Sequence, residues 1–552
     1  MAIEKRSLLR LLLSAALLSV LASGSLLAAD PDSPTTADHS KFEALKGPFA
    51  SGPEVTRACL TCHTEAAKQV MGSIHWTWDY EHPETGQRLG KRRVINAFCG
   101  NVASNEKRCT SCHAGYGWED TETFDFTAET NVDCLVCHDR TGEYVKWEDR
   151  AGHPIYEPKV FGKRHAPYSP ALISETPDGK FLHQPPNLAQ AAMSVGDPGR
   201  ENCGACHFYG GGGDNVKHGD LSTALINPTP HVDVHMSPDG ANMVCTDCHT
   251  AHGHKWPGSR YLGTVKDERE RIPGFRRADT ASCDSCHGRE PHDAMTLKGF
   301  KLNDHTDRVA CQTCHIPEFA KGGKGTKTWW DWSTAGKLRD GKPFAEHDDQ
   351  HRHTYLSTKG DFRWGDDVVP DYAFWNGVIE YTLLGEKIDP SEVVGINKIY
   401  GDAGDPASVI YPFKRMQGRQ AYDTVHNHLL LNNVYGPDGD TALWTNFNWD
   451  KSLAAGMAET DVPYSGEYAF AETQMWWPTT HMVAPADEAL ACDDCHAKEG
   501  RLAALGGFYL PGRDRFGQTD QMGLALLALS LAGVFGHGAI RAVAGWRRNR
   551  KG

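Results

Sequence analysis

The pattern of apolar and polar positions along this 552-residue chain is weak except near its two ends. Short amphipathic stretches predict helices around 66–71 and 188–193. Extended segments broken by Gly and Pro fill much of the remainder. Because no fixed repeat period is present, a tandem-repeat architecture is excluded. The pattern therefore predicts a body of short helices joined by long loops.

The N-terminal end reads as a targeting segment. An apolar run at 11–21 follows three basic residues within the first ten and precedes small residues that end at Ala29. A basic start, a short apolar stretch and small residues are typical of a secretory signal peptide, so we predict one over 1–29. An uncleaved N-terminal anchor is the alternative. Export would place the body in an oxidising compartment.

The C-terminal end reads as a membrane span. Residues 522–540 carry no formal charge and are long enough to cross a bilayer. Five basic residues follow, and such residues stay cytoplasmic. We therefore predict a transmembrane anchor with a basic cytoplasmic tail over 521–552, and a periplasmic body over 30–520. His537 lies within the span and is a candidate for contact with a partner's cofactor, or for an interfacial role.

The net charge of −14 narrows the choice of partners. Nucleic acid carries dense negative charge, so it is excluded as a partner. An anionic substrate would need a local positive site on this acidic protein.

Eight Cys-x-x-Cys-His motifs dominate the chemistry of the chain. In such a motif two thiols hold a c-type haem covalently and the adjacent His becomes the proximal iron ligand. The sequence thus predicts eight covalently bound c-type haems as its cofactors. The haem-binding cysteines are Cys59, Cys62, Cys109, Cys112, Cys134, Cys137, Cys203, Cys206, Cys245, Cys248, Cys283, Cys286, Cys311, Cys314, Cys492 and Cys495. The proximal ligands are His63, His113, His138, His207, His249, His287, His315 and His496.

Two other interpretations of paired cysteines fit poorly. A zinc site needs a second pair of ligands clustered near the first, whereas these motifs are spread along the chain. A thioredoxin-like redox site needs a single motif in a βαβ setting, and no such alternation is visible.

The spacing of the motifs also shapes the expected fold. The first seven lie within 59–315 and the eighth begins at Cys492, which leaves a haem-free stretch at 316–491 that is rich in Trp, Gly and Asp. Each haem buries a large apolar surface, so less hydrocarbon from the protein is needed. We expect a mainly α fold with extensive loops and little β-sheet, a multihaem c-type cytochrome organised around its haems, plus one C-terminal transmembrane helix.

The histidine count bears on the second axial ligands. Eight proximal ligands are drawn from 28 His, and a low-spin electron-transfer haem needs a second His. Candidates lie close to motifs or in polar turns: His75, His218, His235, His254, His292, His305 and His481. Seven such ligands would leave one iron without a His, and substrate needs an open or labile position there.

Three further residues are candidates for that open site. Cys99 is the one cysteine outside the motifs and precedes Cys109 by ten residues. Asp214 and Lys217 lie in the Gly-rich stretch FYGGGGDNVKHGD after the fourth motif. Lys binds iron only when neutral, so iron binding must lower its effective pKa. The alternatives are a small buried thiol for Cys99 and a solvated charge pair for the other two.

The chain resembles the octahaem tetrathionate reductases over about 59–513. The matching stretches are CGACHFYGGGGDNVKHGDL, VDVHM, HTDRVACQTCHIP and HMVAPADEALACDDCH. The resemblance implies that Lys217 is the distal ligand of the second haem, which is held by the motif that ends at His113. It also implies that Cys99 and Asp214 share that pocket. The C-terminal anchor departs from the soluble periplasmic form of the family.

The resemblance also implies an oxidoreductase of the multihaem reductase type. Its expected substrates are small inorganic oxidants: tetrathionate, reduced to thiosulfate, and nitrite or hydroxylamine. The anchor favours a quinol-linked membrane cytochrome as the redox partner. One alternative is a non-catalytic multihaem conduit, in which every iron carries tight His ligands. Another is a hydroxylamine oxidoreductase-like enzyme, against which the Lys-bearing loop argues.

Overall fold

The computed structural model describes residues 37–95, 100–120, 122–162, 169–263, 265, 280–436, 438–515 and 517–550. The predicted signal peptide at 1–29 lies outside these residues. The helices are α2 Gly52–Cys59, α3 Ala66–Met71, α4 Ile74–Thr77, α5 Glu106–Cys109, α6 Leu135–His138, α7 Leu188–Met193, α8 Arg200–His207, α9 Cys245–Cys248, α10 Cys283–His287, α11 Leu297–His305, α12 Cys311–His315, α13 Leu443–Asn446, α14 Trp449–Ala458, α15 Cys492–Cys495 and α16 Gly517–Asn549. The strands are β1 Tyr80–Glu81, β2 Arg88–Leu89, β3 Lys159–Phe161, β4 Ile173–Glu175, β5 Phe181–His183, β6 Thr326–Asp331, β7 Ala345–His347, β8 His353–Leu356, β9 Gly360–Gly365, β10 Asp371–Trp375, β11 Ile379–Tyr381, β12 Val394–Gly395, β13 Asn397–Ile399, β14 Val409–Asp423 and β15 Tyr468–Pro478.

Short helices joined by long loops build the motif-bearing part of the body. The predicted helices at 66–71 and 188–193 are α3 and α7. The Asn187 side chain caps α7 by accepting the Gln190 N–H, which satisfies one of the free donors at the helix start. Motifs six and seven form the whole of α10 and α12. These features confirm the prediction of short helices joined by long loops in the part of the chain that carries the motifs.

The expectation of little β-sheet is wrong for the haem-free stretch. Strands from this stretch form an eight-stranded sheet in the order β12-β15-β14-β6-β9-β8-β7, with β10 paired to β14. Along β15, Ala471, Thr473, Met475 and Trp477 are buried at every second position, which is the pattern of a strand with one covered face. Without a macrocycle to bury, this stretch needs a hydrocarbon core of its own.

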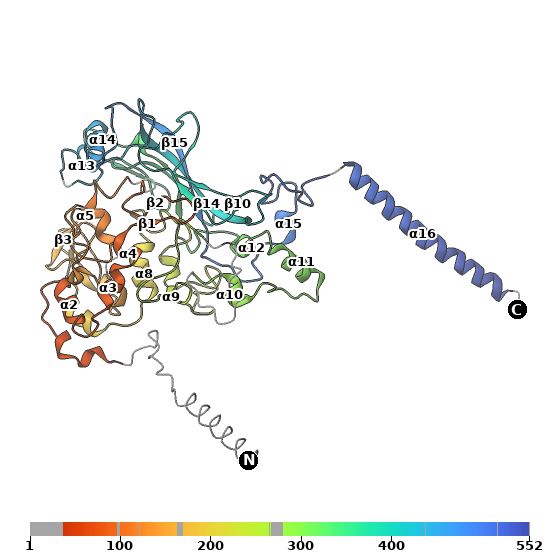
Figure 1. Ribbon diagram of the computed structural model, residues 1–552, viewed down its shortest axis with the longest axis horizontal. Coiled ribbons are helices and arrows are strands. Elements are labelled where there is room, and N and C mark those ends of the chain that lie inside the picture. Colours follow the sequence, from red (N-terminus) through yellow and green to blue (C-terminus); the bar gives the residue numbers. More distant parts are fainter. Residues whose placement is uncertain are drawn as a thin grey trace, which may run out of the picture.

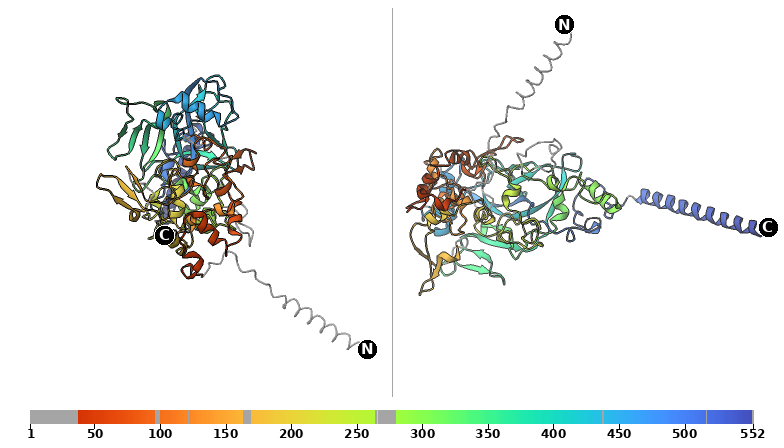
Figure 2. Two further views of the ribbon diagram at one scale, coloured as in Figure 1. Left: turned by 90° about the vertical axis from the view of Figure 1, so that its left-hand side faces the viewer. Right: turned by 90° about the horizontal axis from the view of Figure 1, so that it is seen from below.

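That core lies on the sheet, above the short helices and loops that carry the motifs, which we call the motif layer (Figures 1 and 2). It is built largely from aromatic and aliphatic side chains of residues 330–477, among them Trp330, Phe413 and Met416. The sheet also touches the motif layer directly. On α12, the Thr313 hydroxyl donates to the Ile410 carbonyl of β14 over 2.8 Å. β14 therefore forms a rigid support against which the haem-binding segments pack.

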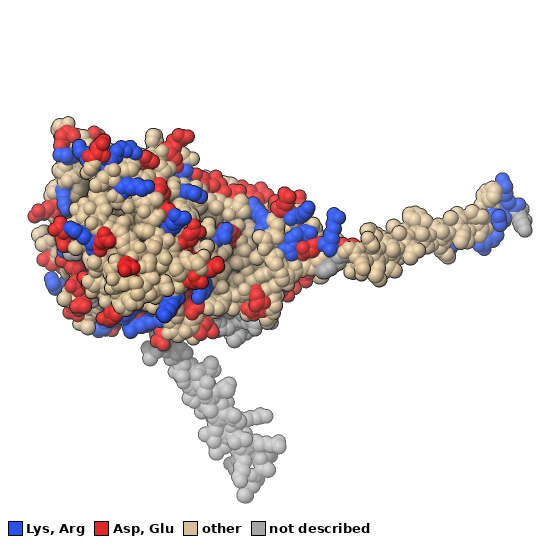
Figure 3. All heavy atoms as spheres, turned by 90° about the horizontal axis from the view of Figure 1, so that it is seen from above, with Lys and Arg blue, Asp and Glu red and all other residues tan. Residues whose placement is uncertain are grey.

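Helix α16 extends away from the body as a single rod (Figure 1). None of its apolar window is buried, and it is the one described helix that is long and apolar enough to cross a membrane. In the space-filling view its length is nearly free of charge, and Lys and Arg gather at its far end (Figure 3). Leu510 packs into a small core with Ile410 and Leu502. The rod therefore starts within a few residues of a fixed point on the body.

Candidate haem and substrate site

One continuous cavity of about 4060 Å³ runs through the motif layer. All eight predicted proximal histidines line it, as do fifteen of the sixteen motif cysteines, with Cys109 as the exception. Protein interiors are close-packed, so an empty space of this size indicates room for a bound group. The cavity has the place and the lining that covalent haems require.

Seven of the eight proximal histidines face a second histidine across this cavity. The pairs, with the distance between ring centres, are His39–His63 (6.1 Å), His75–His207 (6.2 Å), His138–His254 (6.3 Å), His235–His287 (6.0 Å), His249–His481 (6.4 Å), His292–His315 (6.4 Å) and His305–His496 (5.9 Å). A metal–imidazole bond is about 2 Å long, so two rings on opposite sides of one ion have centres about 6 Å apart. The spacing in all seven pairs matches one iron held between two imidazoles.

The ring orientations fit the same arrangement. The Nδ1 atoms of His138, His249 and His496 lie 2.9, 3.0 and 3.1 Å from the backbone carbonyls of Gly196, Pro257 and Pro511. Such contacts fix the tautomer with the proton on Nδ1 and leave Nε2 for iron. Burial lowers the pKa of His207 to about 4, which keeps that imidazole in the neutral form that binds metals.

The structure places six of the seven predicted distal histidines beside a proximal one. The exception is His218, whose ring packs on Trp477 with ring centres 4.7 Å apart. The seventh partner is His39, which sequence reasoning did not select. His39 begins a short 3₁₀ turn, His39–Lys41, that is remote from any motif except the first. The available signal was a histidine in a polar segment N-terminal to the first motif.

His113, in the second motif, is the proximal histidine without a histidine opposite it among the described residues. Its ring is packed among Trp76, Trp78 and Trp118, with ring centres 4.7–5.4 Å away. One ring nitrogen, Nε2, lies 2.7 Å from the Trp76 carbonyl, and the other has no partner in the described chain. Burial lowers the pKa of His113 to about 3. In His113 the carbonyl contact is on Nε2 and the buried nitrogen without a protein partner is Nδ1, the reverse of His138, His249 and His496.

Lys146 supports the second motif from behind. Its ammonium donates to the carbonyls of His113 and Gly115, the latter over 3.0 Å. It also pairs with the Asp133 carboxylate at 3.3 Å, and both side chains are almost fully buried. Asp133 in turn accepts from the hydroxyls of Tyr116 and Tyr144. This network ties the second motif to the third, because Asp133 directly precedes Cys134.

Lys217 lines the cavity and is only 5% exposed. Its backbone is held by Lys414 of β14, whose ammonium donates to the carbonyls of Lys217 (2.5 Å) and Val216 (3.2 Å) and to the Thr326 hydroxyl (2.5 Å). Burial lowers the pKa of Lys414 well below its usual value. Gly219 allows this close approach, because it has a positive φ of 89° and a Cβ there would meet the Phe319 ring at 2.8 Å.

Asp214 belongs to the same loop but serves the loop itself in this geometry. Its carboxylate accepts from the Thr223 N–H over 2.9 Å and from the Thr223 hydroxyl, and it pairs with Lys324 at 3.4 Å. It is not among the described residues that line the cavity. Cys99, the third predicted pocket residue, lies outside the described residues.

Lys91 is a cation that sequence reasoning missed. Its ammonium donates to the Cys109 carbonyl over 3.3 Å, lies 4.3 Å from the centre of a Trp78 ring, and lines the cavity. The available signal was the basic run Lys91-Arg92-Arg93. Together with Lys146 and Arg92, it is one of the cations whose charge reaches His113 of the second motif, in a protein that is acidic overall.

Contacts between motif cysteines give the order of the haem sites in space. The Cys59 and Cys134 side chains lie close enough to affect each other's pKa, as do Cys112 and Cys206, Cys203 and Cys245, and Cys283 and Cys311. Electrostatic range also links Cys137 to Cys203, Cys248 to Cys286, and Cys314 to Cys495. The sites therefore form a line 1-3-4-5-6-7-8, and site 2 branches from site 4.

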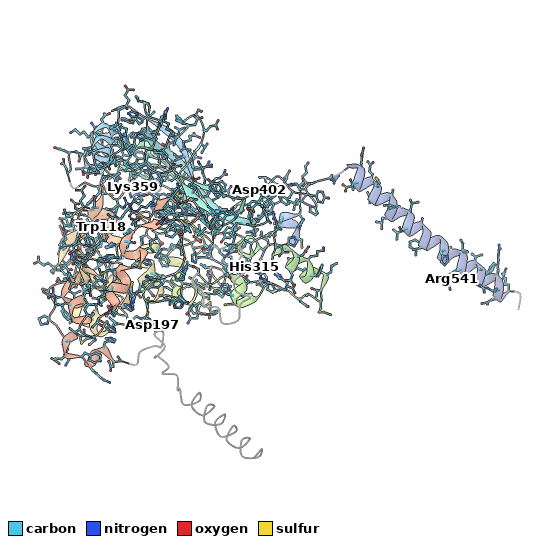
Figure 4. The ribbon with its side chains drawn as sticks, in the orientation of Figure 1. Trp118, Asp197, His315, Lys359, Asp402 and Arg541 are labelled. Carbon is cyan, nitrogen blue, oxygen red and sulfur yellow. The ribbon has the colours of Figure 1, made fainter. Side chains whose placement is uncertain are left out.

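This order runs across the whole body. In the view of Figure 4, Trp118, which packs on the second proximal histidine, lies on the side away from α16, and His315 of the seventh motif lies between Trp118 and α16. α15, which carries the eighth motif, lies where the chain leaves the body towards α16 (Figure 1). The eighth site is thus at the α16 end and the second site at the far end.

Comparisons with known proteins agree with this site. Residues 327–499 match the family model "Cytochrome c bacterial", and residues 58–139 match "Cytochrome c554 and c-prime". A curated relative, an uncharacterised protein of Archaeoglobus fulgidus, is 24% identical over 273 residues, covering 42% of this chain and 84% of the relative. The crystal structure of an octahaem cytochrome c from Shewanella oneidensis is similar with a TM-score of 0.73 and 41% identity, covering 87% of this chain and 99% of that one.

Proposed function

Because this chain belongs to the octahaem c-type cytochromes, in the family of the octahaem tetrathionate reductases, we propose that it is a membrane-anchored periplasmic reductase of small inorganic oxidants. Its cofactors are eight covalently bound c-type haems, and its general role is multihaem electron transfer and redox chemistry. The finer assignment, to tetrathionate with nitrite or hydroxylamine as further substrates, is the proposal.

One observation supports the proposal that the second haem is the site of reduction. Seven proximal histidines have a histidine opposite them, and His113 does not among the described residues. We assign those seven opposite rings as distal ligands: His39, His75, His235, His254, His292, His305 and His481. The second haem is then the one whose sixth position is left to Lys217, which is buried in the same cavity. A labile ligand at that position gives substrate a way in.

The charges around the second motif suit an anionic substrate. Tetrathionate carries two negative charges. Lys91 lines the cavity next to this motif, and Lys217 lines the same continuous cavity. Ammonium groups in a low-dielectric pocket stabilise anions more strongly than they would in water. The haems supply electrons: two electrons cleave the central S–S bond of tetrathionate and release two thiosulfate ions, with no net uptake of protons.

Asp214 acts as a positioning residue in this account. Its contacts to Thr223 and Lys324 hold the loop that presents Lys217. Cys99 keeps the role implied by the resemblance, that of a thiol in the same pocket. A thiolate there would attack one of the two central sulfurs of tetrathionate, which breaks the central S–S bond and releases one thiosulfate. The other half stays on the cysteine as Cys–S–S–SO3⁻, and two electrons from the haems would release it as the second thiosulfate and restore the thiolate.

The C-terminal helix indicates where electrons would enter the protein. We propose that α16 spans the cytoplasmic membrane, so that the eighth haem lies next to the bilayer and receives electrons from a quinol-linked membrane cytochrome. Electrons then pass through sites 7, 6, 5 and 4 to site 2. The short connection from Leu510 to Gly517 supports this placement.

The test is reductase activity with a chemical electron donor. The purified holoprotein, reduced by a viologen dye, is expected to oxidise the dye when tetrathionate, nitrite or hydroxylamine is added, and Lys217→Ala is expected to abolish this. A wild-type protein that transfers no electrons to any of the three would reject the reductase. It would favour the conduit.

The conduit reading has one observation of its own. Sites 3 and 1 continue the line past site 4 and are not needed to reach site 2. The first motif ends this branch with an exposed Cys62, so a haem held there would lie near the protein surface, within reach of a soluble acceptor. Rapid electron transfer to a redox protein, without turnover of any small oxidant, is the result that this reading predicts.

A further inference from the structure

The segment that carries Lys217 also contacts the fifth haem site, through the side chain of Asp220. The Asp220 side chain is buried, and its Oδ2 accepts the backbone N–H groups of Thr480 (2.9 Å) and His481 (3.1 Å). The same oxygen lies 3.1 Å from Nδ1 of the His481 imidazole. The His481 ring in turn faces His249 of the fifth motif, with ring centres 6.4 Å apart and an interplanar angle of 28°.

This carboxylate sets His481 apart from the other paired histidines. The Nδ1 atoms of His254, His292 and His305 face neutral oxygens, on the Gln69 amide (2.7 Å), the Asn303 amide (3.0 Å) and the Lys301 backbone (2.6 Å). The proximal rings with such contacts face backbone carbonyls. Among the described residues, His481 is thus the paired ring whose Nδ1 meets a carboxylate.

We propose that Asp220 lowers the reduction potential of the fifth haem below that of the other bis-histidine haems. A carboxylate that accepts the Nδ1 proton makes the imidazole a more basic ligand. A more basic, more negative ligand stabilises the oxidised, more positive iron relative to the reduced one. The buried position keeps water from screening this charge. Asp220 acts through His481, so it is a positioning and tuning residue.

The place of the fifth haem gives this tuning a consequence. Among the described motif cysteines, those of the fifth site link sites 6 to 8 at the α16 end to site 4, from which site 2 branches. A fifth haem of low potential would stay oxidised until the neighbouring haems are reduced. It would then pass electrons on readily, so transfer to the second haem would begin when several electrons are stored on the protein. This inference rests on the proposed ligation of the fifth haem by His481 and not on the proposed substrate.

The test is a redox titration of the full-length holoprotein, followed by optical and electron paramagnetic resonance spectra. In the wild type, one bis-histidine haem is expected to titrate well below the rest, and His481→Met is expected to remove that component. In Asp220→Asn, the reduction equilibrium of this haem is expected to shift at least tenfold towards the reduced form, which is 59 mV for a one-electron couple. The other haems are expected to be unchanged.

Asn303→Asp is the matched variant in the opposite direction. It places a carboxylate on Nδ1 of His292 and is expected to lower the potential of the seventh haem while the fifth stays in place. An Asp220→Asn protein with intact bis-histidine spectra and unchanged potentials would overturn the proposal. A wild-type titration without a separate low-potential component would overturn it too, even if the variant failed to fold. Neither result touches the assignment of Lys217, which is judged by substrate turnover.

Discussion

The His39 ring lies nearly parallel to the His63 ring of the first motif, with ring centres 6.1 Å apart and an interplanar angle of 17°. The two residues belong to different elements, a 3₁₀ turn and the segment after α2. They face each other across the cavity at the distance that one iron requires. This relationship repeats in six other pairs, and it separates the second motif from the rest.

The first prediction concerns this pair. His39→Ala is expected to convert one low-spin haem to a high-spin form, because the first iron loses its distal ligand. His218→Ala is the matched control, since His218 packs on Trp477 and faces no proximal ring. Room-temperature optical spectra and paramagnetic resonance count the high-spin haems. Conversion in His218→Ala, with none in His39→Ala, would reverse the assignment.

The second prediction concerns Lys414, which holds the Lys217 loop against β14. Lys414→Met leaves buried carbonyls of Val216 and Lys217 without their donor, so it is expected to lower the free energy of unfolding by about 1–3 kcal/mol. The ligation of the second haem is expected to become heterogeneous as the loop loosens. Lys327→Met is the control, because Lys327 packs over the Phe362 ring of the same sheet. Chemical denaturation and paramagnetic resonance measure the two effects.

The third prediction separates the two roles of Asp214. If it only positions the loop, Asp214→Asn keeps the contacts to Thr223, and turnover of hydroxylamine is expected to fall by less than about tenfold. A proton donor at the site would cost about 10²–10⁴-fold on removal. Hydroxylamine reduction consumes protons and tetrathionate reduction does not. A large loss confined to hydroxylamine would therefore assign Asp214 to catalysis.

The fourth prediction concerns α16. A chain that ends after Arg515 is expected to keep its dye-driven reductase activity, because no part of the apolar window of α16 packs on the body. Its reduction by quinol in membrane fractions is expected to be much slower than that of the full chain. Stopped-flow spectra of haem reduction measure both. Equal rates from membranes would remove the anchor from electron supply.

The sequence predicted much of the haem chemistry because that chemistry is local. Eight motifs, the short helices at 66–71 and 188–193, and the apolar C-terminal run are all written in neighbouring residues. The pairing of His75 with His207 is different, because it joins segments far apart in the chain and depends on the fold of the whole body. His218 was a candidate because it lies close to the fourth motif, and His39, which lies well before the first motif, was not among the candidates.

The β-sheet was missed although part of its pattern lies in neighbouring residues. The alternation in β15, with Thr473, Met475 and Trp477 on one face, is visible in the sequence. We expected haems to form the core throughout the body, but the stretch at 316–491 holds no motif and therefore no haem. Such a stretch must bury its own aromatic side chains, and a sheet does so efficiently. The sheet also contributes Lys414, a site residue that no motif signalled.

The most direct test of the account is low-temperature electron paramagnetic resonance of the oxidised full-length protein, compared with Lys217→Ala. The account predicts seven bis-histidine haems that are the same in both proteins. It also predicts one low-spin His/Lys signal that is lost in the variant together with tetrathionate reduction. Eight bis-histidine signals unchanged by the substitution would contradict the assignment of the second haem as the site of reduction.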